Sequence, residues 1–145
     1  MGLWIVPGNK GVVMAKTIED LHSYLVQLNL SYEEPLKDTL IIRGIPGIDN
    51  LVIRIADTVV VFRVKVMNLP QTKQKELFAE LLKINASEML HGAYGLEGDS
   101  LVISDALQLE NLDFNEFAAT LDDISLAIAS HSKRLGHFMS EGGVA

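Results

Sequence analysis

The fold of this chain is decided by residues 51–67, which read LVIRIADTVVVFRVKVM. β-Branched residues dominate both halves and Asp57-Thr58 lies between them, so the stretch predicts an antiparallel hairpin with a two-residue loop. In the register that such a loop sets, six apolar side chains form three cross-strand pairs on one face: Ile55–Val60, Ile53–Phe62 and Leu51–Val64. This face is therefore predicted to lie on a hydrophobic core.

The opposite face of the hairpin carries a mixture of apolar and basic side chains: Val52, Arg54, Val59, Val61, Arg63 and Lys65. Sheets can be packed on both faces, so a helix that covers these valines is one interpretation. In the other interpretation the face is exposed, and a partner polypeptide binds to Val52, Val59 and Val61, with Arg54 and Arg63 beside them. The sequence leaves both interpretations open.

Two further stretches have strand character. Residues 39–43 are rich in β-branched side chains and precede the first hairpin. Gly98-Asp99 predicts the loop of a second hairpin, because glycine tolerates a positive φ. The register of that hairpin gives two apolar cross-strand pairs on one face: Leu96–Leu101 and Tyr94–Ile103.

Three helices are predicted from capping residues and apolar periodicity. The first begins at Thr17 with a capping-box pattern and ends near Leu30, before a Glu-Glu-Pro sequence. The second is opened by Leu69-Pro70, and the third follows the N-cap Asp113 and extends to about Leu135. The inner stripe of the second helix consists of Leu77, Phe78, Leu81, Leu82 and Asn85.

These elements predict an α+β fold in which helices pack on an antiparallel sheet of about five strands, in the order α-β-β-β-α-β-β-α. The 145 residues are expected to form a single domain, with a core over residues 17–138. Residues 1–13 are interpreted as an arm or as a mis-assigned start, since Met14 is a second candidate for the first residue.

The composition of the chain argues against several classes of function. The formal charge of −7 disfavours a nucleic-acid partner, and no apolar run approaches the length of about 20 residues that spans a bilayer. The chain has no cysteine, which excludes thiolate chemistry and disulfides. With no secretory signal at its start, the chain is expected in the cytoplasm.

No pattern of catalytic, cofactor-binding or metal-ligating residues emerges. His131 and His137 are six residues apart and point to different sides of a helix, and His22 has no ligand at metal-binding spacing. The serines lack a nucleophile-elbow motif. His91 is the one candidate for catalysis, because it opens a glycine-rich hairpin; the alternative is a structural histidine that bonds a turn or a helix end.

Several segments together resemble a known family. The sequence LLKIN at 81–85 is followed by HGAYGL at 91–96, LVI at 101–103, LQLENLD at 107–113 and a long final helix. Over about residues 17–135 this is similar to the type III secretion chaperone fold, shared by CesT-type chaperones and YbjN-type regulators. The resemblance implies a small non-enzymatic homodimer that binds another polypeptide in extended form. It also implies a dimer interface near the second helix, at Leu77, Phe78, Leu81, Leu82 and Asn85.

Three functions therefore remain open. The first is a chaperone-like module that binds a polypeptide, and the second is a YbjN-like regulator that uses the same surface for a folded partner or a small effector. The third is an enzyme that uses His91.

Overall fold

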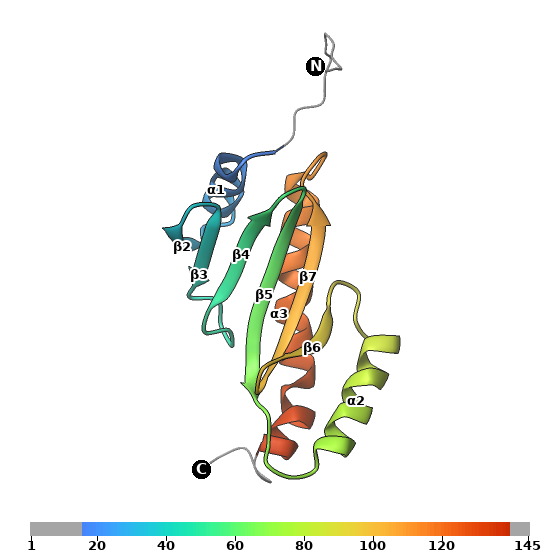
Figure 1. The fold of residues 1–145 in the computed structure, drawn as a ribbon. Helices are drawn as coiled ribbons and strands as arrows, with labels where there is room; N and C mark the ends of the chain where they lie inside the picture. Colours follow the sequence, from blue (N-terminus) through green and yellow to red (C-terminus); the bar gives the residue numbers. More distant parts are fainter. Residues whose placement is uncertain (1–15, 140–145) are drawn as a thin grey trace.

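The computed structural model describes residues 16–139 and shows one sheet with three helices (Figure 1). The interpretation of residues 1–13 as an arm, and the choice between Met1 and Met14, lie outside the described residues. In chain order the elements are α1 (Ile18–Gln27), β2 (Ser31–Leu36), β3 (Thr39–Arg43), β4 (Leu51–Ala56), β5 (Val59–Asn68), α2 (Gln74–Ser87), β6 (Ala93–Glu97), β7 (Ser100–Gln108) and α3 (Phe114–Phe138). The predicted α+β class with an antiparallel sheet is confirmed.

Both predicted hairpins have the expected register. In the β4–β5 pair Ile53 lies opposite Phe62, and in the β6–β7 pair Tyr94 lies opposite Ile103. The sheet order is β2-β3-β4-β5-β7-β6, with every neighbouring pair antiparallel. β7 therefore lies between β5 and β6, and β6 forms one edge of the sheet.

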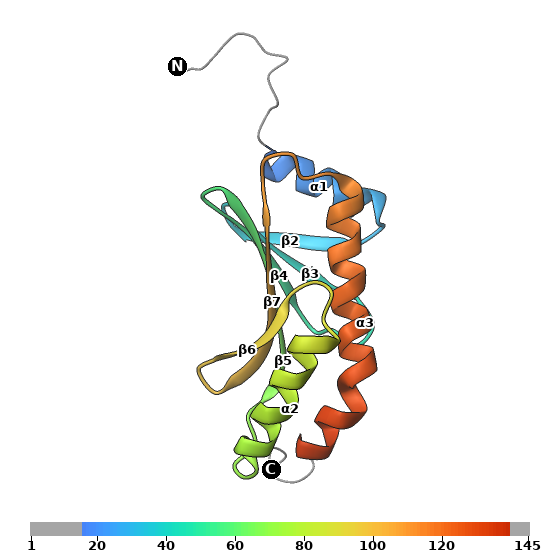
Figure 2. The same ribbon diagram turned by 90° about the vertical axis from the view of Figure 1, so that its right-hand side faces the viewer.

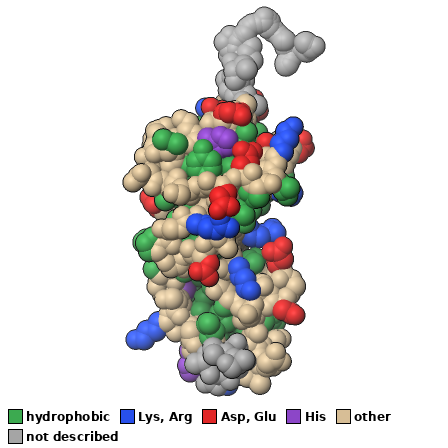
Figure 3. Space-filling model, turned by 90° about the vertical axis from the view of Figure 1, so that its left-hand side faces the viewer, with side chains coloured by type: hydrophobic (Ala, Val, Ile, Leu, Met, Phe, Trp, Pro, Cys, Tyr) green, Lys and Arg blue, Asp and Glu red, His purple; other side chains and the backbone are tan. Residues whose placement is uncertain are grey.

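The sheet has six strands because residues 31–36, which were expected only to follow the end of the first helix near Leu30, form the edge strand β2. Pro35 lies where the pairing with β3 shifts register, and a proline is tolerated at a bulge of an edge strand. Glu33 on this edge forms an ion pair with Arg43. Figure 3 shows this side of the molecule, where acidic and basic side chains lie close together, as is typical of an edge that is protected from pairing with other chains.

The hydrophobic core lies between one face of the sheet and the helices. α1 and α3 cover that face, and α2 lies beside β6 on the same side (Figure 2). Phe117 of α3 packs on Phe62 of β5 at a ring-centroid distance of 5.6 Å and on Tyr24 of α1 at 5.3 Å. One aromatic ring thus joins the sheet to two helices.

α1 and α3 begin at the predicted capping residues, whereas the start of α2 and the ends of α1 and α3 differ from the prediction. Asp113 accepts a hydrogen bond from the backbone N–H of Glu116 at 2.7 Å, as an N-cap does. α1 ends at Gln27, before the expected Leu30, and α3 continues past Leu135 to Phe138. α2 begins at Gln74, later than the Leu69-Pro70 sequence that was expected to open it.

The inner stripe of α2 also differs from the expected one. The fully or nearly fully buried residues of this helix are Leu77, Leu81 and Ile84, whereas Leu82 is exposed. Leu82 lies one residue after Leu81 and therefore points about 100° away from it around the helix. The apolar residue at position 82 thus faces away from the core.

Candidate functional site

The face of the sheet opposite the core carries no helix among residues 16–139 (Figure 2). We call it the open face; its side chains alternate along each strand with those of the core. Val52, Val59 and Val61 lie on it half-buried, while Arg54 and Arg63 are exposed. A helix over these valines, one of the two interpretations of the sequence, is therefore wrong for the described part of the chain.

Strand pairing arranges the side chains of the open face in rows across the sheet. One row runs Ile41, Val52, Arg63 and Ser104, and the next runs Thr39, Arg54, Val61 and Ala106. The apolar members of the two rows form a band that crosses β3, β4, β5 and β7: Ile41, Val52, Val61 and Ala106. Arg54 and Arg63 lie on opposite sides of this apolar band, because each is paired across the strands with one of its valines.

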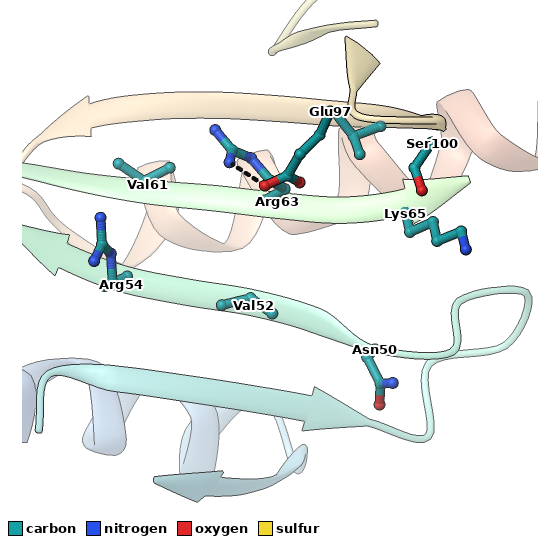
Figure 4. A pocket seen from close by; sticks show the side chains of 9 residues that line it. Asn50, Val52, Arg54, Val61, Arg63, Lys65, Glu97 and Ser100 are labelled. Atoms are coloured by element: carbon teal, nitrogen blue, oxygen red, sulfur yellow. Dashed lines mark hydrogen bonds and ion pairs between the residues drawn. The ribbon is translucent and has the colours of Figure 1, made fainter. Parts of the chain in front are cut away.

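The open face is hollowed over β4, β5 and β7 (Figure 4). The depression has a volume of about 590 Å³ and is lined by Asn50, Val52, Arg54, Val61, Arg63, Lys65, Glu97, Ser100 and Val102. The turn between β6 and β7 projects toward the open side (Figure 2) and brings Glu97 and Ser100 to its wall. Val59, at the start of β5, lies on the same face outside the depression.

The charges of this depression are mostly positive. Arg63 forms an ion pair with Glu97 at 3.3 Å, drawn as a dashed line in Figure 4. Arg54 and Lys65 make no ion pair or hydrogen bond through their side chains with any residue in the described range 16–139. The surface therefore combines aliphatic side chains with two unpaired cations.

A second apolar surface lies where α2 meets β6, at the residues expected near a dimer interface. Leu77 and Leu81 are buried in the core of their own chain, so they present little surface to a second chain. Leu82 is 67% exposed and Leu96 of β6 is 52% exposed, and both line a groove of about 190 Å³ with Phe78. We call this surface the α2–β6 groove.

Asn85, also expected at that interface, has an intramolecular role. Its side-chain amide donates to the backbone carbonyl of Tyr94 at 3.1 Å, and its carbonyl oxygen accepts from the Tyr94 N–H at 2.8 Å. The side chain thereby joins the last turn of α2 to β6.

His91 lies in the loop between α2 and β6, half-buried, with its Nδ1 in contact with the Asp123 carboxylate of α3. The sequence left open a structural role for this histidine, as a hydrogen-bond partner of a turn or a helix end. Its partner is instead the side chain of Asp123. Asp123 is half-buried by this contact, while its neighbour Asp122 is exposed. The contact ties the loop to α3.

A second histidine, His131, was considered from the sequence only as a metal ligand together with His137, and the network that it joins was not predicted. It is only 2% exposed, and its Nδ1 lies 2.8 Å from the hydroxyl of Tyr94. Its Nε2 lies 3.1 Å from Glu88, which also accepts a hydrogen bond from Arg134 at 2.7 Å. No local signal could have identified this network, because it joins residues 37 and 43 positions apart.

The network changes the acidity of two of its members. The hydrogen bond from Arg134 lowers the pKa of Glu88, because it stabilises the carboxylate. Burial raises the pKa of Tyr94 to about 12, because the phenolate would lose its hydration. The neutral phenol of Tyr94 is therefore the form that this site stabilises.

Residues 16–139 contain neither a cluster of metal-ligating side chains nor a helix that could cross a membrane. No group of three or more His, Asp or Glu side chains is arranged there to hold a metal ion. None of the three helices combines the length and the apolar character that a membrane crossing requires.

Comparison with known proteins identifies relatives of the fold. The model of the CesT_Tir_1 family matches residues 14–141. No curated protein matches the sequence. The structure of YbjN from E. coli is similar with a TM-score of 0.65 and 20% sequence identity, and the match covers 86% of this chain and 97% of that one.

Two solved complexes also contain similar chains. The heterodimeric complex ExoU–SpcU from the type III secretion system of Pseudomonas aeruginosa matches with a TM-score of 0.62 and 17% identity, over 74% of this chain and 91% of that one. The HopA1–SchA chaperone–effector complex matches with a TM-score of 0.56 and 11% identity, over 74% and 86% of the two chains. At these identities the similarity establishes the fold.

Proposed function

Because the chain belongs to the CesT_Tir_1 family, we propose that it binds a partner polypeptide in extended form on its open face. The predicted resemblance to type III secretion chaperones and YbjN-type proteins is confirmed by the family match and by the fold. A similar chain occurs in a chaperone–effector complex, which supports a polypeptide as the partner here.

The observation that carries the proposal is the apolar band on a hollowed sheet face that no helix within residues 16–139 covers. Side chains on one side of an extended segment repeat about every 6.6 Å, the same interval as residues on one face of a strand. Val52 and Val61 are diagonal neighbours across β4 and β5, at a separation of about 7–8 Å, so alternate side chains of a bound segment that crosses the two strands can contact both. Burial of such aliphatic surface supplies the free energy of binding.

We further propose a homodimer in the cytoplasm that catalyses no reaction. The α2–β6 groove is a suitable contact between copies, since Leu82 and Leu96 expose apolar surface there. A contact at this groove leaves the depression on the open face accessible, because the two are lined by different residues.

A labelled peptide tests the proposal. The probe has about twelve residues that alternate valine with serine, so that it spans about 40 Å when extended. Backbone amide NMR signals of the protein should shift in β4, β5 and β7 when the peptide is added. Fluorescence anisotropy then measures its affinity for variants of the protein.

The double variant Val52→Thr, Val61→Thr should bind this peptide more weakly, because it removes apolar contact area while it keeps β-branched side chains in the strands. Its melting temperature should change little, since both valines lie on the open face. Val26→Thr, at an exposed valine of α1, is the matched control and should bind as the unmodified protein does. Absence of binding, or equal binding by the double variant, would contradict the proposal.

A further inference from the structure

We infer that the polypeptide bound on the open face presents aspartate or glutamate between apolar residues along the side that faces the sheet. The inference rests on the proposed function and adds the chemistry of the partner. Its basis is the distribution of charge around the apolar band.

Basic residues are concentrated on the open face of an acidic protein. The chain has a formal charge of −7, yet the strand side chains on this face include four basic residues and two acidic ones. They are Arg43, Arg54, Arg63 and Lys65, with Glu33 and Glu97. The open face is therefore locally positive, and a basic segment would be repelled there.

The cations nearest to the apolar band are available to a ligand. Arg54 and Lys65 have no side-chain partner among residues 16–139. Arg63 is paired with Glu97 at 3.3 Å, but both side chains are exposed. An exposed pair of this kind contributes at most about 1 kcal/mol to stability, so a carboxylate of the partner can replace Glu97.

The positions of the arginines match a segment whose sheet-facing side alternates apolar and acidic residues. Arg54 lies beside Val61 and Arg63 beside Val52, so each valine has a cation as its cross-strand neighbour. In Figure 4 Arg63 and Lys65 follow Val61 along β5, and Arg54 lies next to Val52 along β4. When a sheet-facing apolar side chain of the segment contacts one of the valines, a carboxylate two residues further along points to the same side and lies within reach of the guanidinium groups, which bind carboxylates in bidentate fashion.

Three peptides of about twelve residues test this inference, each with serine at every second position and, between the serines, valine alternating with glutamate, serine or lysine. Affinities are measured by fluorescence anisotropy at about 0.15 M salt, where the Debye length of about 8 Å limits the effect of the net charge of the protein. The glutamate peptide should bind roughly tenfold or more tightly than the lysine peptide, with the serine peptide between them.

The double variant Arg54→Glu, Lys65→Glu should invert this order, since it places two carboxylates beside the apolar band. Both residues are exposed and unpaired in the described structure, so the fold should tolerate the change, and a melting curve verifies this. Lys133→Glu is the matched control, because it makes the same change of charge per residue on an exposed position of α3.

The outcomes separate the inference from the proposed function. If all three peptides bind equally and shift the NMR signals of the open face, the acidic preference is wrong and the proposed function stands. If the glutamate peptide is preferred but the double variant keeps that preference, the cations of the open face are not its cause and the inference is overturned. If no peptide binds, the inference and the proposed function both fail.

Discussion

Asp113 determines where the longest helix begins. Its carboxylate accepts the Glu116 N–H at 2.7 Å, one of the backbone donors that the first turn of a helix leaves without a partner. Leu112 before it and Phe117 after it are both fully buried, as in a hydrophobic staple. Polar and apolar contacts thus define the same helix start.

Replacing this cap should weaken the fold without affecting binding. Asp113→Ala should lower the free energy of unfolding by about 1 kcal/mol, because the N–H of Glu116 loses its acceptor. Asp113→Asn, which can still cap, should lower it less. Urea unfolding measures both variants. A loss of peptide binding in Asp113→Ala at unchanged stability would contradict a structural role.

Tyr94 predicts a dependence of stability on alkaline pH. Its pKa is raised from 10.0 to about 12, mainly by burial; Arg134 opposes the shift and the Glu88 carboxylate adds to it. The unfolded chain therefore releases this proton first as the pH rises. The contribution of Tyr94 is complete below pH 10 and is lost as the pH passes through about 12.

Tyr94→Phe should remove this contribution. Across the same range of pH, the free energy of unfolding should fall less steeply in the variant than in the unmodified protein, because phenylalanine has no proton to release. At pH 9 and below the variant should be less stable by about 1 kcal/mol, since the hydrogen bond to His131 is lost. Parallel curves for the two proteins above pH 10 would contradict the assignment.

At the scale of elements, the connection between α2 and β6 depends on side chains. Asn85 forms two hydrogen bonds with the backbone of Tyr94, His91 contacts Asp123, and His131 bonds both Tyr94 and Glu88. These contacts hold the loop against α3 and hold β6 against α2. They explain how an edge strand of five residues keeps its position.

Asn85→Ala tests this connection. It leaves the N–H and the carbonyl of Tyr94 without their side-chain partner in a half-buried site, so the free energy of unfolding should fall by about 2 kcal/mol. Lys83→Ala, at an exposed position of the same helix, should change it by less than about 0.5 kcal/mol. Equal stability of the two variants would show that the bonds of Asn85 are dispensable.

The sequence predicted the two hairpins correctly but missed the edge strand β2. Two-residue loops and alternating apolar residues define the registers of β4–β5 and β6–β7, because both signals are local. β2 was not recognised, since Glu33, Glu34 and Pro35 are unusual in a central strand and are tolerated only at an edge. Whether a strand lies at an edge depends on its neighbours in the sheet.

At the scale of the whole molecule, two separate surfaces are assigned to two kinds of contact. The open face carries the depression proposed for a polypeptide, and the α2–β6 groove carries exposed leucines proposed for a second copy of the chain. Because the two surfaces share no lining residue, a substitution at one should leave the other intact.

Because the chain is proposed to form a homodimer, light scattering at micromolar concentration should give twice the chain mass of 15.9 kDa. Leu82→Glu should reduce the measured mass to that of one chain, because it places a charge in the apolar contact. Leu126→Glu is the matched control, since Leu126 on α3 is also 67% exposed, and it should stay dimeric. Peptide binding should persist in Leu82→Glu. A monomer mass for the unmodified chain would refute the homodimer.

The sequence by itself determined the class of the fold, the hairpin registers, the starts of α1 and α3, and the residues of the open face. These features depend on contacts between residues close in the chain, which turn residues, capping residues and alternation encode directly. The sequence could not show whether a helix covers Val52 and Val61, because valines occur both on exposed sheet faces and on faces that a helix covers.

Only the tertiary structure decided which surface is free. The insertion of β7 between β5 and β6, the position of all three helices on one face and the burial of His131 depend on contacts between residues far apart in the chain. Such contacts follow from how complete elements pack, because each helix has one apolar stripe and covers the single sheet face that buries it. The face left over is the one that carries the apolar band with Arg54 and Lys65, which have no side-chain partner within residues 16–139.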